Sequence, residues 1–428
     1  MAQQTPKTYR NQTIYSIFIR NYSPEGTFEG VRRDLPRVQA LGVDMIWLMP
    51  IHPTGLAARK GSLGSPYAIR DYRTVNPEFG TMEDFAALVG DIHALGMKCI
   101  IDVVYNHTSP DSVLAREHPE WFYRRPDGSF GNRVGDWWDV IDLDYAQPGL
   151  WDYQIDTLKF WAQYVDGFRC DVAPLVPLDF WKRARGDVEA VRPGCIWLAE
   201  SVEPGFITAL RGQGPGCLSD AELYQAFDLC YDYDTYHTFR RGLTGRSSLA
   251  DYAGAVNLQE TIYPDNYVKL RFLENHDQPR AAFLLPAGNA LENWTAFCFF
   301  QKGTAMVYAG QEASCTHCPS LFDRDTVDWS GPDRSDLIRR LCGMKKHPLF
   351  TDSVYHVDAL PGDFLRAGHR SGARQLVGVF SARGTAGLVP VEAPDGVYEN
   401  LLGGTAEVRD GLVSYSGKPV VFEAALAL

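Results

Sequence analysis

Residues 98–107 read KCIIDVVYNH. This apolar, β-branched run carries Asp102 within it and closes on Asn106 and His107. A helix-like amphipathic stretch, residues 82–95, precedes it. Such a run is typical of a buried parallel strand, and polar groups at the carboxyl end of a parallel strand are candidates for a functional site.

The same alternation of short apolar run, loop and helix-like stretch recurs along the chain. Helix-like stretches include residues 30–41, 82–95 and 151–164. The expected strands are residues 14–19, 44–49, 98–104, 165–171, 195–200, 227–230, 268–273 and 305–309. Eight β–α units predict an α/β protein built on a parallel (β/α)₈ TIM barrel.

Two segments break this alternation. Residues 107–143 are rich in Pro, Gly, Trp and charge, which predicts a short insertion domain after the third strand. Residues 351–428 consist of short alternating runs separated by Gly and Pro, which predicts a C-terminal antiparallel β-sandwich domain. The barrel is then expected in two parts, residues 1–106 and 144–350.

Composition narrows the classes of function. The 428 residues carry a net charge of −12, and this argues against a nucleic-acid partner, because phosphate binding requires clustered Lys and Arg. No apolar run approaches the length of a membrane span, and the first residues lack a secretion signal, so we expect a cytoplasmic protein with no membrane partner. No feature of the sequence indicates an oligomeric state.

The nine cysteines are scattered along the chain. Several lie in apolar runs, where Cys acts as a small buried hydrophobe. Cys315 and Cys318 form a single C-x-x-C around His317. A zinc site would need a second pair of ligands at a suitable spacing, and the sequence offers none, although a metal or disulfide at this pair stays open.

Carboxylates occur at or near the ends of four of the expected strands: Asp102, Asp171, Glu200 and Asp277. A single strand-end Asp often caps the next helix, but several converging carboxylates are costly unless a task requires them. Retaining glycoside hydrolysis uses such a set, because one carboxylate attacks the anomeric carbon while another donates a proton to the leaving oxygen.

Basic groups accompany these carboxylates. Arg169 lies two residues before Asp171 on the same strand, so both side chains point to one face and the guanidinium is expected to keep Asp171 ionised. His107 and His276 are expected to donate hydrogen bonds to sugar hydroxyls; the alternative is that they are core histidines.

Four of these stretches, DVVYNH (102–107), GFRCD (167–171), WLAE (197–200) and ENHD (274–277), together resemble the signature segments of glycoside hydrolase family 13, the α-amylase family. IYSIFIR (14–20), SPYAIRDY (65–72), YAGQE (308–312) and LFDRDTVDW (321–329) extend the likeness over most of residues 12–345. The resemblance implies that Asp171 is the nucleophile, Glu200 the general acid/base and Asp277 the carboxylate that stabilises the transition state.

The resemblance also implies a substrate-binding set. Tyr67 is expected to stack on the sugar at the cleavage point, and Asp102 to be a supporting carboxylate. His107, Arg169 and His276 are expected to line the same subsite.

The chain departs from the family pattern after the nucleophile. Many α-amylases carry a Lys-His pair there that serves a structural calcium, whereas this chain has Pro174 and Leu175. Asn106 matches one calcium ligand, but the set is incomplete, so we expect no metal and no cofactor. Val172 is a residue that the family often uses in enzymes acting on α-1,6 bonds and also in members that cleave both linkages.

The sequence therefore predicts a retaining α-glycosidase that hydrolyses α-1,4 bonds in maltooligosaccharides or related α-glucans. Alternatives are an α-1,6 or mixed-linkage hydrolase, and a family member that transfers the glycosyl group to a sugar or phosphate. A non-enzymatic binding subunit is disfavoured because all three carboxylates are present. Trp121, Phe122, Trp137 and Trp138 form either a platform for outer sugars or the packing of the insertion.

Overall fold

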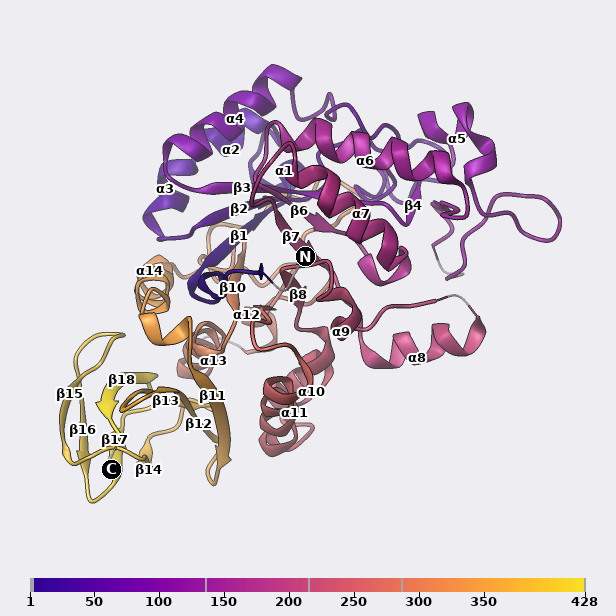
Figure 1. Cartoon of the computed structure of the whole chain (residues 1–428). Coiled ribbons are helices and arrows are strands. Elements are labelled where there is room, and N and C mark those ends of the chain that lie inside the picture. Colours follow the sequence, from indigo (N-terminus) through magenta and orange to yellow (C-terminus); the bar gives the residue numbers. More distant parts are fainter. Residues whose placement is uncertain (1–3, 135–136, 215, 286–287, 427–428) are drawn as a thin grey trace.

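The computed structural model describes residues 4–134, 137–214, 216–285 and 288–426 (Figure 1). Two residues of the expected insertion, 135 and 136, lie outside the described part, as do residues 1–3, 427 and 428 of the expected outer segments. Within the described residues, no helix is long and apolar enough to cross a membrane.

Eight parallel strands close into a barrel in the order β1-β10-β9-β8-β7-β6-β3-β2. The strands are β1 (Thr13–Ile17), β2 (Met45–Leu48), β3 (Lys98–Val103), β6 (Gly167–Cys170), β7 (Ile196–Ala199), β8 (Leu229–Tyr231), β9 (Lys269–Arg271) and β10 (Thr304–Tyr308). The predicted TIM barrel is confirmed. β8 is shifted from the predicted run 227–230, and β9 is shorter than the predicted run 268–273. Neighbours such as Val268 and Phe272 are buried but do not join the hydrogen-bonded ladder.

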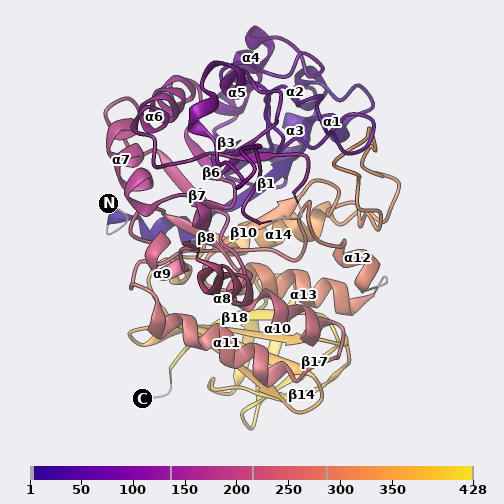
Figure 2. The same cartoon turned by 90° about the vertical axis from the view of Figure 1, so that its right-hand side faces the viewer.

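Helices surround the barrel (Figures 1 and 2). They are α1 (Ile19–Tyr22), α2 (Phe28–Arg32), α3 (Leu35–Ala40), α4 (Met82–Ala94), α6 (Pro148–Ala162), α7 (Leu178–Glu189), α8 (Pro204–Gln213), α9 (Asp220–Leu223), α10 (Tyr233–Leu243), α11 (Leu249–Ile262), α12 (Ala281–Leu284), α13 (Asn289–Phe300) and α14 (Ser335–Lys345). The helix expected over residues 30–41 is instead two helices. Pro36 lacks an N–H and its ring clashes with the carbonyl four residues earlier, so it is accommodated in the first turn of a new helix, α3.

The segment after β3 forms a small excursion over the barrel. Its elements are β4 (His107–Thr108), α5 (Val113–Glu117) and β5 (Ile141–Asp142). β4 and β5 pair antiparallel, with His107 opposite Asp142. This pairing ties the end of the insertion back to the end of β3.

The C-terminal part is two antiparallel four-stranded sheets. Their strands are β11 (Val354–Leu360), β12 (Phe364–Ser371), β13 (Arg374–Ser381), β14 (Gly387–Pro390), β15 (Gly396–Glu399), β16 (Thr405–Arg409), β17 (Leu412–Tyr415) and β18 (Val420–Ala425). The β11-β12-β13-β18 sheet packs on α11 and α13 of the barrel (Figure 2). Phe380 of β13 contacts Phe297 and Phe300 of α13, with ring centroids 5.3 and 5.4 Å apart. Barrel and inner sheet therefore share one apolar core.

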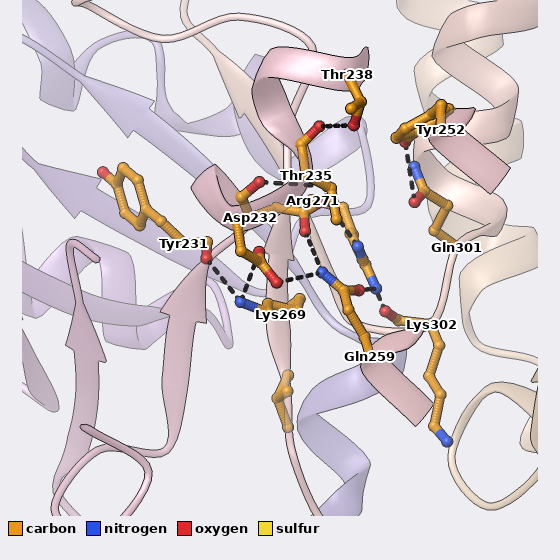
Figure 3. Close-up of polar contacts among 12 residues, drawn as sticks. Tyr231, Asp232, Thr235, Thr238, Tyr252, Gln259, Lys269, Arg271, Gln301 and Lys302 are labelled. Atoms are coloured by element: carbon orange, nitrogen blue, oxygen red, sulfur yellow. Dashed lines mark hydrogen bonds and ion pairs between the residues drawn. The ribbon is translucent and has the colours of Figure 1, made fainter. Parts of the chain in front are cut away.

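A buried polar network fastens α10 and α11 to strands β8 and β9 (Figure 3). The Arg271 guanidinium lies 2.7 Å from Asp232 and donates to Gln259 Oε1 at 2.8 Å. Gln259 in turn donates to Asp232 at 2.9 Å. Lys269 contacts Asp234 at 2.8 Å and also Asp220. Both cations of this network, Lys269 and Arg271, have carboxylate partners, as burial of charge requires.

Candidate active site

A cleft of about 320 Å³ opens at the carboxyl ends of the barrel strands. Asp171 directly follows β6 and Glu200 directly follows β7, so the barrel itself delivers both carboxyl groups to the same end. The lining residues are Lys60, Ser65, Tyr67, His107, Trp137, Asp139, Val140, Asp171, Val172, Glu200, His276, Asp277, Leu321 and Phe322.

Arg169 lies beneath this cleft and joins three carboxylates. Its Nη1 is 2.8 Å from Asp102 Oδ1 and 2.7 Å from Asp171 Oδ1, and its Nη2 is 2.9 Å from Glu200 Oε1. The Arg169 side chain is fully buried. Burial alone would lower its pKa, but Asp102 and Glu200 outweigh burial and raise it well above the usual value. The guanidinium is therefore a fixed positive charge behind the site.

Asp171 and Glu200 share this cation and still differ in proton affinity. Burial raises the pKa of Asp171 to about 6, against the lowering effect of Arg169. Burial raises the pKa of Glu200 to about 8, where Arg169 lowers it and the charges of Asp171 and Asp277 raise it further. Near pH 7, Asp171 is mainly ionised and Glu200 mainly protonated. Such a separation assigns one carboxyl group to be nucleophile and the other to be acid.

Val172 connects these two groups through the backbone. Its N–H donates to Glu200 Oε2 at 2.8 Å. Its φ of 34° and ψ of 46° lie in the left-handed region, which is unfavourable for a β-branched residue. A strained backbone at a site of this kind is typical of a functional constraint, and here the strain aims a donor at Glu200.

The side of the cleft formed by Tyr67 and His276 carries a chain of hydrogen bonds. The Tyr67 hydroxyl donates to Asp102 Oδ2 at 3.1 Å and lies 2.8 Å from His276 Nε2. The two rings stack, with centroids 5.4 Å apart and planes at 17°. His276 Nε2 is 3.0 Å from Asp277 Oδ2. Burial would raise the pKa of Asp277, but His276 outweighs burial and lowers it, so this carboxylate stays ionised.

His107 lies on another wall, against Trp137, with ring centroids 5.4 Å apart. Burial lowers the pKa of His107 to about 4, so the ring is neutral near pH 7. Asn106 Nδ2 lies 3.1 Å from His107 Nδ1, which places the ring proton on Nε2. That Nε2 faces Asp171 Oδ2 at 3.8 Å, within reach of a sugar hydroxyl between them.

The structure thus gathers all eight residues singled out from the sequence at one end of the barrel. Six of them line the cleft: Tyr67, His107, Asp171, Glu200, His276 and Asp277. Asp102 and Arg169, expected to bind substrate, are fully buried and do not line the cleft, so they act on a ligand only through the groups they hold.

Among the other lining residues, Lys60 and Asp139 had no signal of their own in the sequence, whereas Phe322 lies in the stretch 321–329 that extends the family likeness. All three come from loops, and the long-range packing of those loops brings them to the cleft. Of the four insertion aromatics singled out from the sequence, Trp137 lines the cleft and Trp138 is 58% exposed. Trp121 stacks on His118 and Phe122 is buried, so these two rings pack the insertion.

The position of the family's calcium offers few side-chain oxygens. Calcium takes six to eight oxygen ligands. Asp142 supplies one buried carboxylate, whose Oδ1 has no hydrogen-bond partner among the described residues, and Asn106 supplies an amide. Pro174 and Leu175, like the Lys-His pair of many family members, can offer only backbone carbonyl oxygens. In the part of the chain that the structure describes, no group of three or more His, Cys, Asp and Glu could hold a metal ion.

The C-x-x-C pair lies at the edge of the Asp277 loop. Cys318 is exposed and its thiol donates to the Gln278 carbonyl at 3.6 Å, whereas Cys315 is buried. All nine cysteines are free, and eight of them are buried.

Comparison with known proteins gives two matching family profiles. Residues 6–127 match the α-amylase catalytic domain, and residues 356–422 match the bacterial α-amylase C-terminal domain. Among solved structures, an α-amylase from Lactobacillus plantarum is 49% identical with a TM-score of 0.95, over 97% of this chain and 99% of that one. A noncanonic maltogenic α-amylase from Thermotoga neapolitana is 34% identical with a TM-score of 0.86, over 98% and 100%.

Curated relatives carry a different name, α-1,4-glucan:maltose-1-phosphate maltosyltransferase. The protein from Rhodospirillum rubrum is 35% identical over 274 residues, and that from Cereibacter sphaeroides is 32% identical over 302 residues. These matches cover 58% and 64% of this chain, which spans only 36% and 47% of the two relatives.

Proposed function

The chain belongs to the α-amylase family, and on that premise we propose that it cleaves α-1,4-glucosidic bonds in maltooligosaccharides or related α-glucans with retention of configuration. The observation that carries this proposal is the pair Asp171 and Glu200, held by one guanidinium with pKa values of about 6 and about 8. Retaining enzymes need two carboxyl groups about 5–5.5 Å apart, one ionised and one protonated.

In the first step, the Asp171 carboxylate forms a bond to the anomeric carbon as the bond from that carbon to the glycosidic oxygen breaks. Glu200 gives its proton to that oxygen, so the leaving chain departs with a hydroxyl group. Arg169 remains paired with Asp171 and keeps its attacking oxygen in place.

In the second step, the Glu200 carboxylate takes a proton from water as the water oxygen attacks the anomeric carbon. The bond to Asp171 breaks and the sugar leaves with its original anomeric configuration. Asp277 remains ionised beside His276 and is placed to bind hydroxyls of the distorted sugar and to stabilise its positive charge.

A second candidate keeps the first step and replaces water by another acceptor. The maltosyltransferase names of the curated relatives favour it, because phosphate or a sugar hydroxyl attacks the same glycosyl-enzyme. Transfer to phosphate would give a glycosyl phosphate. Activity on α-1,6 bonds is a further alternative, for which Val172 is the only motivating residue.

The cleavage is tested by following products from maltose through maltoheptaose, with panose and isomaltose alongside. Parallel reactions contain inorganic phosphate or a sugar acceptor. Short sugars that form without added acceptor and without longer sugars alongside support hydrolysis. Glycosyl phosphate or lengthened sugars that form at the expense of short ones support transfer, and products from panose or isomaltose extend the linkage.

The roles are tested with Asp171→Asn and Glu200→Gln, each expected to lower kcat by about 10³-fold or more while a maltooligosaccharide still binds. Glu203→Gln, three residues beyond on the exposed start of the next helix, is the control and should keep wild-type turnover. Wild-type turnover in Glu200→Gln would remove Glu200 from its role.

The free cysteines support a reducing compartment such as the cytoplasm, because oxidising compartments favour disulfides. The partner we propose is the α-glucan alone. The net charge of −12 gives no support to nucleic-acid binding.

A further inference from the structure

The Lys60 side chain lines the cleft and contacts residues of two other loops. It lies on the segment between β2 and α4, and its Nζ is 2.7 Å from Asp139 Oδ1 of the insertion. The same Nζ lies 5.5 Å from the ring centroid of Trp138 and 5.8 Å from that of Phe322, which follows β10. One ammonium group thus joins loops that follow three different barrel strands.

The Lys60 loop is itself fastened on its far side. Ser62 donates from its N–H and its hydroxyl to Asp323 Oδ1 at 2.8 and 2.7 Å, and the Leu63 N–H donates to the Phe322 carbonyl at 2.9 Å. Gly61 has a φ of +62°, and a Cβ there would lie 2.7 Å from Phe322 Cβ. The close approach therefore requires glycine, and the loop holds Lys60 in one position.

This contact belongs to the same cleft as the carboxyl groups. Lys60, Asp139 and Phe322 line it together with Asp171 and Glu200. The charge of Asp139 raises the pKa of His107 and that of Lys60 lowers it, which places the pair near the ring that faces Asp171.

The burial of Asp139 makes its ion pair with Lys60 costly to break. The Asp139 side chain is only 4% exposed, and a buried carboxylate needs a partner. The Lys60 side chain is 25% exposed, and an ammonium group has three donors, so it has donors left for a sugar hydroxyl after pairing with Asp139. The cleft volume of about 320 Å³ is near the lower limit for ligand pockets, roughly 300 Å³, which suits a short sugar segment.

We propose that the Lys60–Asp139 pair is a clamp that closes one end of the cleft, so that the enzyme acts on chain ends and releases or transfers short units of about one or two glucoses. The proposal rests on the α-glucan activity proposed above and specifies its substrate: the end of a chain, with Lys60 binding a hydroxyl of the terminal sugar. The length of the product is then set by two loop residues, Lys60 and Asp139, and not by the catalytic carboxylates.

The test compares wild-type protein with Lys60→Met and Asp139→Asn on maltoheptaose, reading the ratio of products longer than maltose to glucose and maltose at low conversion. Methionine keeps the apolar stem against the two rings and removes the charge. In both variants we expect that ratio to rise by about tenfold, the lower end of the discrimination that one steric contact gives. Because the readout is a ratio, it is independent of any loss in total rate.

Lys159→Met is the matched control, since Lys159 pairs with Asp156 at 3.6 Å on the surface of α6, away from the cleft. It should give the wild-type ratio. The ratio is read at a temperature well below the unfolding transition of each variant, so that a loss of stability does not affect it. An unchanged ratio in Lys60→Met or Asp139→Asn, with a wild type that is active, overturns the clamp alone. A wild type that forms neither short sugars nor glycosyl phosphate from any α-glucan overturns the proposed function, and the clamp with it.

Discussion

At the scale of single residues, the site depends on one cation that serves three acids. Arg169 pairs with Asp102, Asp171 and Glu200 and holds them close together, yet the pKa values of Asp171 and Glu200 differ, at about 6 and about 8. Burial is the largest cause of both shifts; the charge of Asp102 adds to the shift of Asp171, and the charges of Asp171 and Asp277 add to that of Glu200. Burial together with these neighbouring charges thus gives the two groups the different proton affinities that acid–base chemistry needs.

This difference predicts a bell-shaped pH profile for kcat/KM. Below about pH 6, Asp171 gains a proton and loses its nucleophilic form. Above about pH 8, Glu200 loses the proton that it must donate. Initial rates on a maltooligosaccharide from pH 4 to pH 10 would test this. A rate that stays constant through pH 9 would contradict the role of Glu200 as acid.

The position of a site residue was predictable from the sequence where a barrel strand places it. Asp171 and Glu200 follow apolar runs directly, and a parallel strand sends the residue at its end to the shared rim. The contact between Lys60 and Asp139 was not predictable. The two residues are 79 positions apart and are brought together by loop packing, which no local sequence pattern encodes.

At the scale of elements, the loop of residues 53–66 carries Lys60, and Gly61 fixes the path of its backbone. We expect Gly61→Ala to destabilise the protein by about 1–2 kcal/mol, because alanine is strained at φ +62° and its Cβ would displace Phe322. We also expect the product ratio to shift in the direction that we expect for Lys60→Met. Thermal unfolding and product analysis measure the two effects.

Gly90→Ala is the control for this change. Gly90 lies in α4, where an added Cβ meets nothing within 4 Å and φ is helical, so alanine should leave stability unchanged or raise it by about 0.5–1 kcal/mol. A Gly61→Ala variant as stable as Gly90→Ala would show that the loop of residues 53–66 does not need its glycine.

The network of Figure 3 gives a second prediction at this scale. Asp232→Ala leaves the Arg271 guanidinium buried without its carboxylate and should cost about 3–5 kcal/mol. The double variant Asp232→Ala/Arg271→Met removes both charges and should recover a large part of that loss. Unfolding midpoints of the three proteins decide the matter, and a double variant less stable than Asp232→Ala would contradict this account.

The type of each element, helix or strand, was predictable to about the same degree as the positions of the site residues, again for a physical reason. The strands β15 and β17, residues 396–399 and 412–415, lie among the short alternating runs predicted for residues 351–428, because alternation and turn residues are local signals. The division of residues 30–41 into α2 and α3 was missed because the apolar positions continue through Pro36, and only the backbone chemistry of proline interrupts the helix.

At the scale of the whole molecule, barrel and inner C-terminal sheet form one cooperative unit. Their side chains share a single core, and Asn293 of α13 accepts from the Ser381 N–H at 2.9 Å and donates to the Gly417 carbonyl at 2.9 Å. We therefore expect one calorimetric transition for the full chain. Phe380→Ala should lower it as a whole, at a cost of about 3–5 kcal/mol.

The outer sheet supplies the control for this prediction. Val397 of β15 is 68% exposed, so Val397→Ala should leave the transition in place. Two separate transitions in wild type, of which Phe380→Ala shifts only one, would show that the sheets and the barrel unfold independently.

The pattern of buried thiols also makes the molecule convenient to label. Of nine cysteines, all in the described part of the chain, Cys318 alone is exposed, and its thiol touches the backbone next to Asp277. A maleimide dye would therefore attach at one place, on the rim of the cleft, without prior removal of the other cysteines. Its emission would then report on a sugar entering or leaving, and so give dissociation rates that product analysis does not reach.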